Sequence, residues 1–172
     1  MSKPIELSTI QSQLWMSKLL RRAQKIGVLG EVPVSAVILD HKGRCIGHGS
    51  NDRERKKDPL GHAEIIALRQ AALIRNDWRF NDCTLIVTLE PCPMCAGALI
   101  QARMGQVIFG ASDLKRGGLG GAVNLSKDKS AHHKMIVKGG VMSDLAKNQL
   151  KEWFKLQRKV FLEKEATQFQ KD

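Results

Sequence analysis

Two short motifs, each at the start of a predicted helix, constrain the fold of this chain most. The first is His-Ala-Glu at residues 62–64, and the second is Pro-Cys-Pro-Met-Cys at residues 91–95. The segment between them, residues 65–90, has room for one helix and one buried strand. A helix followed by a strand brings the second motif back beside the first, so the spacing predicts an α/β unit in which the two motifs meet.

The two cysteines of the second motif have the spacing of paired metal ligands. Cys92 and Cys95 are three residues apart and therefore lie on one face of a helix. Pro93 suits the first helical position, so both sulfurs are expected at a helix N-terminus, where the helix dipole favours the thiolate that binds metal. A redox pair is the alternative, but such pairs usually follow a strand in a thioredoxin-like context and need no upstream His-x-Glu.

His62 completes a set of three ligands with Cys92 and Cys95. Three protein ligands leave one tetrahedral position open for water, which is the arrangement of a catalytic zinc, so we expect one Zn²⁺ per chain. A structural zinc site would need a fourth ligand, which Cys45 or Cys83 could supply.

Glu64 is the candidate proton carrier beside this metal. In a regular helix it would lie about 200° around from His62, so both can face one metal only if His62 stands at the helix start. Pro59 and Gly61, just before His62, favour such a start. Zinc would lower the pKa of a bound water, and Glu64 would move its protons. The alternative role for Glu64 is a carboxylate that only interacts with the helix dipole.

Hydrophobic periodicity and turn residues predict the remaining elements. The expected helices cover about residues 9–26, 63–73, 93–102 and 144–164, and the expected strands cover 34–39, 45–49, 84–89 and 107–109, with 135–137 as an additional candidate. This order predicts a sheet covered by helices in a single domain, residues 1–172. Residues 50–58 are expected to form a charged loop. Residues 117–121 contain four glycines but no phosphate-binding lysine, which predicts a flexible surface loop.

Basic residues are concentrated in the two ends of the chain. The net charge is +11, from 28 Lys and Arg against 17 Asp and Glu. Residues 1–60 and 127–172 each hold 11 basic and 6 acidic residues, whereas residues 61–126 hold 6 and 5. A basic surface attracts polyanions, of which nucleic acid is the commonest, although it can also serve solubility alone.

The sequence argues against a membrane or secreted protein. No apolar run approaches membrane-spanning length, and the N-terminal MSKPIELSTI lacks the pattern of a signal peptide. We therefore expect a cytoplasmic protein without a membrane partner, whose four cysteines are thiols or ligands. Other cysteines and histidines are expected to be structural or at the surface: Cys45, Cys83, His41, His48, His132 and His133.

Three stretches closely resemble the bacterial tRNA-specific adenosine deaminases. They are EVPVSAVIL at 31–39, GHAEIIALRQ at 61–70 and TLIVTLEPCPMCAGALIQARMGQVIFGASD at 84–113. His-x-Glu followed by Pro-Cys-x-x-Cys is the signature of zinc nucleobase deaminases, with the glutamate as proton carrier and not ligand. The resemblance, from about residue 14 to 159, implies the three-layer α/β/α cytidine deaminase-like fold, with a central mixed sheet of about five strands covered by helices.

The resemblance also implies a substrate and its contacts. The family forms homodimers and converts the wobble adenosine, position 34 of a tRNA anticodon, to inosine with release of ammonia. Asn51 is implied to hold the base, with Ala63 and Asp113 as further substrate-binding residues. In the basic last helix, Phe154 and Arg158 are implied to contact RNA. Asn51 could otherwise be a turn residue and Phe154 a core residue.

The chain departs from the family pattern at three places. Residues 60–61 are Leu-Gly where the family often has Thr and Ala, Ser112 replaces an arginine that often precedes the aspartate, and segment 117–131 has little likeness. Two other functions stay open. One is deamination of a free base or nucleoside such as guanine, cytosine or cytidine, because the same zinc chemistry serves both. The other is a non-catalytic zinc or RNA-binding module, which an intact Glu64 argues against.

Overall fold

The structure, a computed structural model, describes residues 3–169 and the side chains of residues 3–163. The helices and strands follow one another in the order that the sequence predicts, with the short helix α2 in addition. Their bounds are α1 (Thr9–Val28), β1 (Ser35–Leu39), β2 (Cys45–Ser50), α2 (Arg53–Lys56), α3 (Ala63–Arg75), β3 (Thr84–Leu89), α4 (Pro93–Gln101), β4 (Gln106–Ala111), a 3₁₀ turn (Leu125–Lys127), β5 (Ile136–Lys138) and α5 (Ser143–Phe169).

The five strands form one mixed sheet in the order β2-β1-β3-β4-β5. β1 pairs antiparallel with β2 and β3, while β3, β4 and β5 run parallel. The parallel pair of β3 and β4 needs a crossover connection, which α4 supplies. This arrangement confirms the predicted mixed sheet of about five strands.

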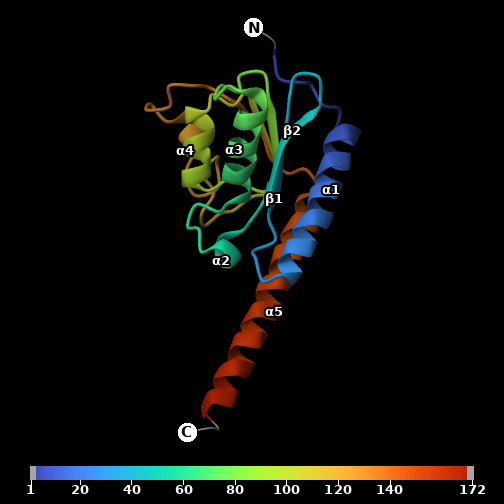
Figure 1. Cartoon of the computed structure of the whole chain (residues 1–172), viewed down its shortest axis with the longest axis vertical. Coiled ribbons are helices and arrows are strands. Elements are labelled where there is room, and N and C mark those ends of the chain that lie inside the picture. Colours follow the sequence, from blue (N-terminus) through green and yellow to red (C-terminus); the bar gives the residue numbers. More distant parts are fainter. Residues whose placement is uncertain (1–2, 170–172) are drawn as a thin grey trace.

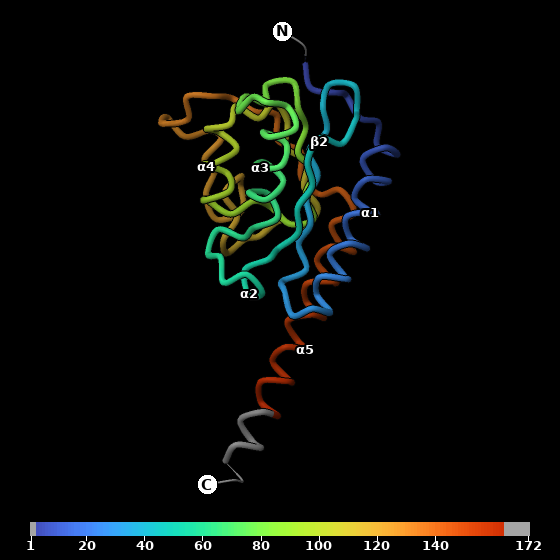
Figure 2. The backbone as a smooth tube through the Cα atoms, viewed as in Figure 1, coloured from blue at the N-terminus to red at the C-terminus, as the bar shows by residue number. Residues whose placement is uncertain are grey.

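Helices cover both faces of the sheet and make three layers (Figure 1). One core joins α3 and α4 to the sheet and contains Ala67, Leu85 and Leu99. The other joins α1 to the opposite face and contains Met16 and Ile86. Figure 2 traces α1 and α5 side by side on this second face, where the Trp153 indole N–H donates to the Gly27 carbonyl. The predicted α/β/α architecture is confirmed.

The start of α3 is fixed by very close packing on β2. A Cβ added at Gly49 would stand 2.1 Å from the Ala63 carbonyl oxygen, and one at Gly47 would stand 2.5 Å from that of Ala67. Side chains at these two positions would push α3 away from the sheet. Two glycines of β2 therefore set the depth at which the first motif is held.

Four predicted features need correction. Residues 53–56 form the short helix α2 within the segment predicted as a loop, β5 is shifted by one residue, and α5 continues to Phe169 instead of about residue 164. The prediction of a flexible surface loop at 117–121 is wrong for residues 117–119, because these residues are buried. The glycines there allow close packing. Within the described residues, no helix combines the length and apolarity needed to cross a membrane.

Candidate functional site

The first motif lies where the loop after α2 becomes α3. His62 is the residue before the helix and has extended backbone angles, φ −81° and ψ 147°. Because His62 stands before the regular helix, the angle of about 200° that separates residues two apart in a helix does not apply to His62 and Glu64. Both side chains can therefore face the same side. Both also line the same cavity. The helix start that the sequence required for this geometry is confirmed.

The second motif opens α4 in the same way. Cys92 is the residue before the helix, with φ −68° and ψ 169°, Pro93 occupies the first turn, and Cys95 follows within that turn. Cys92 is half-buried and Cys95 is buried. The predicted placement of both sulfurs at a helix N-terminus is confirmed.

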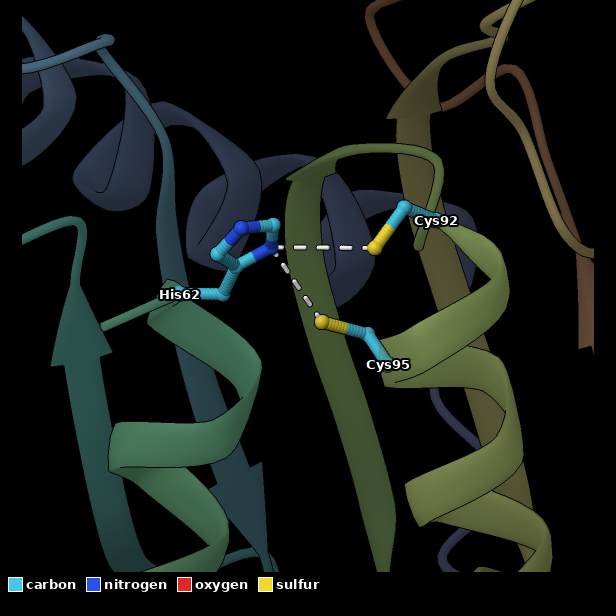
Figure 3. Close-up of side chains that lie close together, drawn as sticks. All are labelled: His62, Cys92 and Cys95. Carbon is cyan, nitrogen blue, oxygen red and sulfur yellow. Dashed lines mark hydrogen bonds between the residues drawn. The ribbon is translucent and has the colours of Figure 1, made fainter. Parts of the chain in front are cut away.

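The two helix starts bring three ligand atoms together, as Figure 3 shows. The His62 Nδ1 atom is 3.7 Å from the Cys92 Sγ atom and 3.5 Å from the Cys95 Sγ atom, and all three ligand atoms lie within 4.8 Å of one another. Ligand atoms of tetrahedral zinc stand roughly 3.5–3.8 Å apart, given its bond lengths to nitrogen and sulfur. One imidazole and two thiols at these distances fit a zinc ion.

Among the described residues, no fourth protein ligand lies close to these three. The cluster of possible ligands there contains His62, Cys92 and Cys95 only. Cys45 is exposed, and the Cys83 thiol lies 3.0 Å from an Arg75 guanidinium nitrogen. Burial raises the pKa of the Cys83 thiol to about 12, so this thiol stays protonated. This argues against the alternative of a four-ligand structural zinc site.

Hydrogen bonds within the cluster prepare one sulfur as a thiolate. The Cys95 thiol donates to Cys92, and together with His62 this lowers the pKa of the Cys92 thiol to about 4. The same hydrogen bond, aided by burial, raises the pKa of Cys95. The proton of this pair therefore stays on Cys95, and Cys92 is the thiolate. The hydrogen bond to Cys92 also raises the pKa of the His62 imidazole.

Glu64 lies in the first turn of α3, with 4% of its surface exposed. Burial raises the pKa of its carboxyl group, and the side chain hydrogen-bonds to Cys95. A carboxyl group with a raised pKa beside a cluster of candidate metal ligands is suited to receiving and returning protons near neutral pH. A surface carboxylate that only interacts with the helix dipole would not be buried in this way.

A cavity of about 870 Å³ opens over the cluster. Its lining includes most of the residues that the sequence analysis singled out: Asn51, His62, Glu64, Cys92, Asp113, Phe154 and Arg158. Ala63 and Cys95 are fully buried beneath it and are not part of its lining. Segments far apart in the sequence, from the residues before β1 to α5, therefore line one cleft.

The predicted substrate contacts differ in how they are held. The Asn51 side-chain oxygen accepts a hydrogen bond from the Ala63 N–H, so both residues already have a structural contact. The Asp113 carboxylate accepts from the backbone N–H groups of Lys115 and Arg116. Phe154 is 44% exposed and packs edge-on against Trp153, which argues against the core alternative. Their roles in substrate binding stay predictions.

Several residues of this cleft were not predicted from the sequence. Basic side chains from α2, the loop after β4 and the start of α5 also line it: Arg53, Lys115, Arg116 and Lys147. No motif marks them, because each lies in a segment with ordinary surface composition. Glu90 was also missed, although a lone charge at the end of the apolar run 84–89 was a visible signal.

Comparison with known proteins relates this chain to deaminases. Residues 10–158 match the family of MafB19-like deaminases. The tRNA-specific adenosine deaminase of Haemophilus influenzae is 41% identical over 139 residues, which cover 81% of this chain and 80% of that protein. That of Bacillus subtilis is 37% identical over 149 residues, covering 87% and 92%.

A solved structure supports the same relationship. It comes from biochemical and structural studies of A-to-I editing by tRNA:A34 deaminases at the wobble position of transfer RNA. The two chains share 33% sequence identity and superpose with a TM-score of 0.75, covering 78% of this chain and 96% of that chain.

Proposed function

Because the chain belongs to the MafB19-like deaminases and to the family of tRNA-specific adenosine deaminases, we propose that it deaminates adenosine in tRNA. The substrate is the wobble adenosine at position 34 of an anticodon, and the products are inosine and ammonia. The observation that carries this proposal is the buried Glu64 beside the cluster of His62, Cys92 and Cys95 at the base of one cleft.

One zinc ion per chain would be held by the Nδ1 atom of His62 and the Sγ atoms of Cys92 and Cys95. When bound, it would supply a Lewis acid that lowers the pKa of a water molecule at the open position. The low pKa of the Cys92 thiol favours the ligand form of that sulfur before the metal arrives. The start of α4 holds both sulfurs together at the base of the cleft.

Glu64 would move the protons of the reaction. Its carboxylate takes a proton from the attacking water and passes it to a ring nitrogen of adenine, while the water oxygen adds to the carbon that bears the amine. The carboxyl then helps protonate the amine, which leaves as ammonia. Water is consumed and no oxidant is needed. Burial of Glu64 excludes bulk water from this exchange.

The walls of the cleft suit an RNA substrate. Seven basic side chains line it: Arg53, Lys115, Arg116, Lys147, Lys151, Lys155 and Arg158. A base that is unstacked and drawn into a pocket needs its neighbouring phosphates held, and Phe154 offers an exposed ring for stacking. We extend the proposal to a cytoplasmic homodimer, on the resemblance to the family alone.

Deamination assays on tRNA and on free compounds test the proposal. The zinc-loaded protein is incubated with bulk tRNA, and in parallel with adenosine, guanine, cytosine and cytidine. We expect inosine at position 34 of one or a few tRNAs and negligible ammonia from the free compounds. Ammonia from a free base, with no inosine in tRNA, would contradict the proposal and favour the small-substrate alternative.

A further inference from the structure

Glu90 ends the run that leads from β3 into the second motif, and its carboxylate is buried, with 3% of the residue exposed. Three backbone N–H groups donate to it. Oε2 accepts from Asp113 at 3.0 Å, and Oε1 accepts from Leu119 at 3.0 Å and from Gly121 at 2.8 Å. The loop after β4 thus closes around an anion supplied by its own chain, much as glycine-rich loops close around bound phosphates.

The glycines of this loop are what allow the approach. A Cβ added at Gly117 would lie 2.4 Å from the Glu90 Cδ atom, and one at Gly121 would lie 2.7 Å from Oε2. The Gly118 N–H also donates to the Pro91 carbonyl at 2.8 Å. The loop is therefore fastened to residues 90–91, directly before the metal-ligating pair.

The same loop forms one wall of the cleft. Residues 112–116 line it, and Lys115 and Arg116 are its basic members. Their backbone N–H groups donate to the Asp113 carboxylate, each at 3.0 Å, while the Asp113 N–H donates to Glu90. A series of hydrogen bonds therefore connects the buried Glu90 carboxylate to the two basic residues at the cleft.

We propose that Glu90 is a positioning residue that sets this wall of the cleft for the RNA substrate. It acts through the backbone of residues 113–121 and not by touching the reacting atoms. The proposal rests on the proposed function for the identity of the substrate. Holding Lys115 and Arg116 in place before binding reduces the ordering that the RNA must otherwise impose. The role is thus in substrate affinity, separate from proton transfer.

Glu90→Gln tests this with little change in side-chain volume. The carboxylate faces N–H donors at both oxygens, so either orientation of the new amide turns its NH₂ group toward at least one backbone N–H. That donor loses its hydrogen bond and repels the amide. We expect KM for an anticodon stem-loop RNA to rise about tenfold, the effect of losing one hydrogen bond to a charged group. We expect kcat to change little and the zinc content to stay at one per chain.

Gly121→Ala disturbs the same contact from the loop side and leaves Glu90 intact. Its Cβ would stand 2.1 Å from the Asp113 carbonyl oxygen, so the loop must shift. The same rise in KM is expected. Gly97→Ala is the matched control, because a Cβ there meets no atom within 4 Å. Glu6→Gln controls for charge: Glu6 is exposed and outside the cleft lining, so removing its negative charge should not raise KM for an RNA.

The outcomes separate this inference from the proposed function. A rise in KM for Glu90→Gln and Gly121→Ala, without loss of zinc, supports the positioning role. Unchanged KM in both variants, or a fall in kcat that parallels a loss of zinc, would overturn it. If the wild-type enzyme deaminates a free base but no RNA, the proposed function is refuted instead. That result would also overturn a role for Glu90 that is specific to RNA.

Discussion

The side-chain oxygen of Asn51 accepts a hydrogen bond of 3.1 Å from the backbone N–H of Ala63, at the first turn of α3. Both groups are buried, so the bond joins the end of β2 to the helix that carries Glu64. Asn51 therefore has a structural role irrespective of any contact with substrate.

Two substitutions separate this structural role from a role in holding the base. Asn51→Asp keeps an oxygen acceptor for the Ala63 N–H but removes the amide NH₂ group, whereas Asn51→Ala removes both. We expect Asn51→Ala to lower the free energy of unfolding by about 1 kcal/mol, the usual cost of losing such an acceptor at a helix start. Asn51→Asp should keep the stability and raise KM for tRNA. Full activity of Asn51→Asp would exclude a role of Asn51 in holding the base and leave only its structural role.

Loss of one sulfur should release the metal. Cys92→Ala leaves His62 and Cys95, and two ligands cannot hold zinc tightly. Metal analysis of the purified protein should give about one zinc for the wild type and much less than half for this variant. Cys83→Ala is the control, because that thiol lies outside the ligand cluster. A Cys92→Ala protein with its full complement of zinc would refute the ligand assignment.

The close contact between β2 and α3 predicts a stability effect. Gly49→Ala places a Cβ against the Ala63 carbonyl oxygen, so the helix must move or the strand must bend. We expect a loss of about 1–3 kcal/mol in the free energy of unfolding, as for other overpacked sites. Chemical denaturation measures this. Gly97→Ala in α4, which meets open space, should be neutral or stabilising, so equal effects at both positions would argue against the packing described here.

Basic residues of α5 should contribute to RNA affinity through phosphate contacts. Lys151, Lys155 and Arg158 line the cleft, whereas Lys159 is absent from its lining and lies 3.9 Å from the Glu163 carboxylate. Replacing the first three with Ala should weaken tRNA binding and reduce its salt dependence. The log–log slope should fall by roughly 0.7–0.9 for each lost phosphate contact.

A matched triple variant checks that this effect is local. Lys127, Lys129 and Lys134 are exposed and outside the cleft lining, and their replacement removes the same net charge. Binding titrations at several salt concentrations compare the two triples. Equal slopes for both triples would mean that the basic charge acts at long range or serves solubility only.

The sequence predicted the parts of this site that are local in the chain. Cys92 and Cys95 belong to one helix start, and His62 and Glu64 to another, so spacing and helix geometry were enough to place each pair. The order of apolar segments predicted a sheet covered by helices, and the family resemblance implied that this sheet is mixed. Residue spacing and the order of segments both depend on residues that are neighbours in sequence.

Contacts between residues far apart in the chain could not be predicted from the sequence. The hydrogen bonds of Glu90 reach residues 23 to 31 positions away, so nothing near Glu90 in the sequence indicates its partners. For the same reason, the glycines at 117–121 suggested flexibility, whereas Gly117 and Gly121 are needed for close approach to that carboxylate. Arg53 and Lys115 are far apart in the sequence, and the fold brings both to the lining of the cleft.

The most direct test of the whole account is the rate of a single turnover by Glu64→Gln. The substitution keeps the size of the buried side chain and removes its ability to take up a proton. With zinc content and tRNA affinity measured in the same preparation, we expect both to match the wild type. The deamination rate at position 34 should fall by roughly 10²–10⁴-fold, the contribution of general acid–base catalysis. A zinc-loaded Glu64→Gln protein that retains more than about a tenth of the wild-type rate would contradict the role of Glu64 as proton carrier.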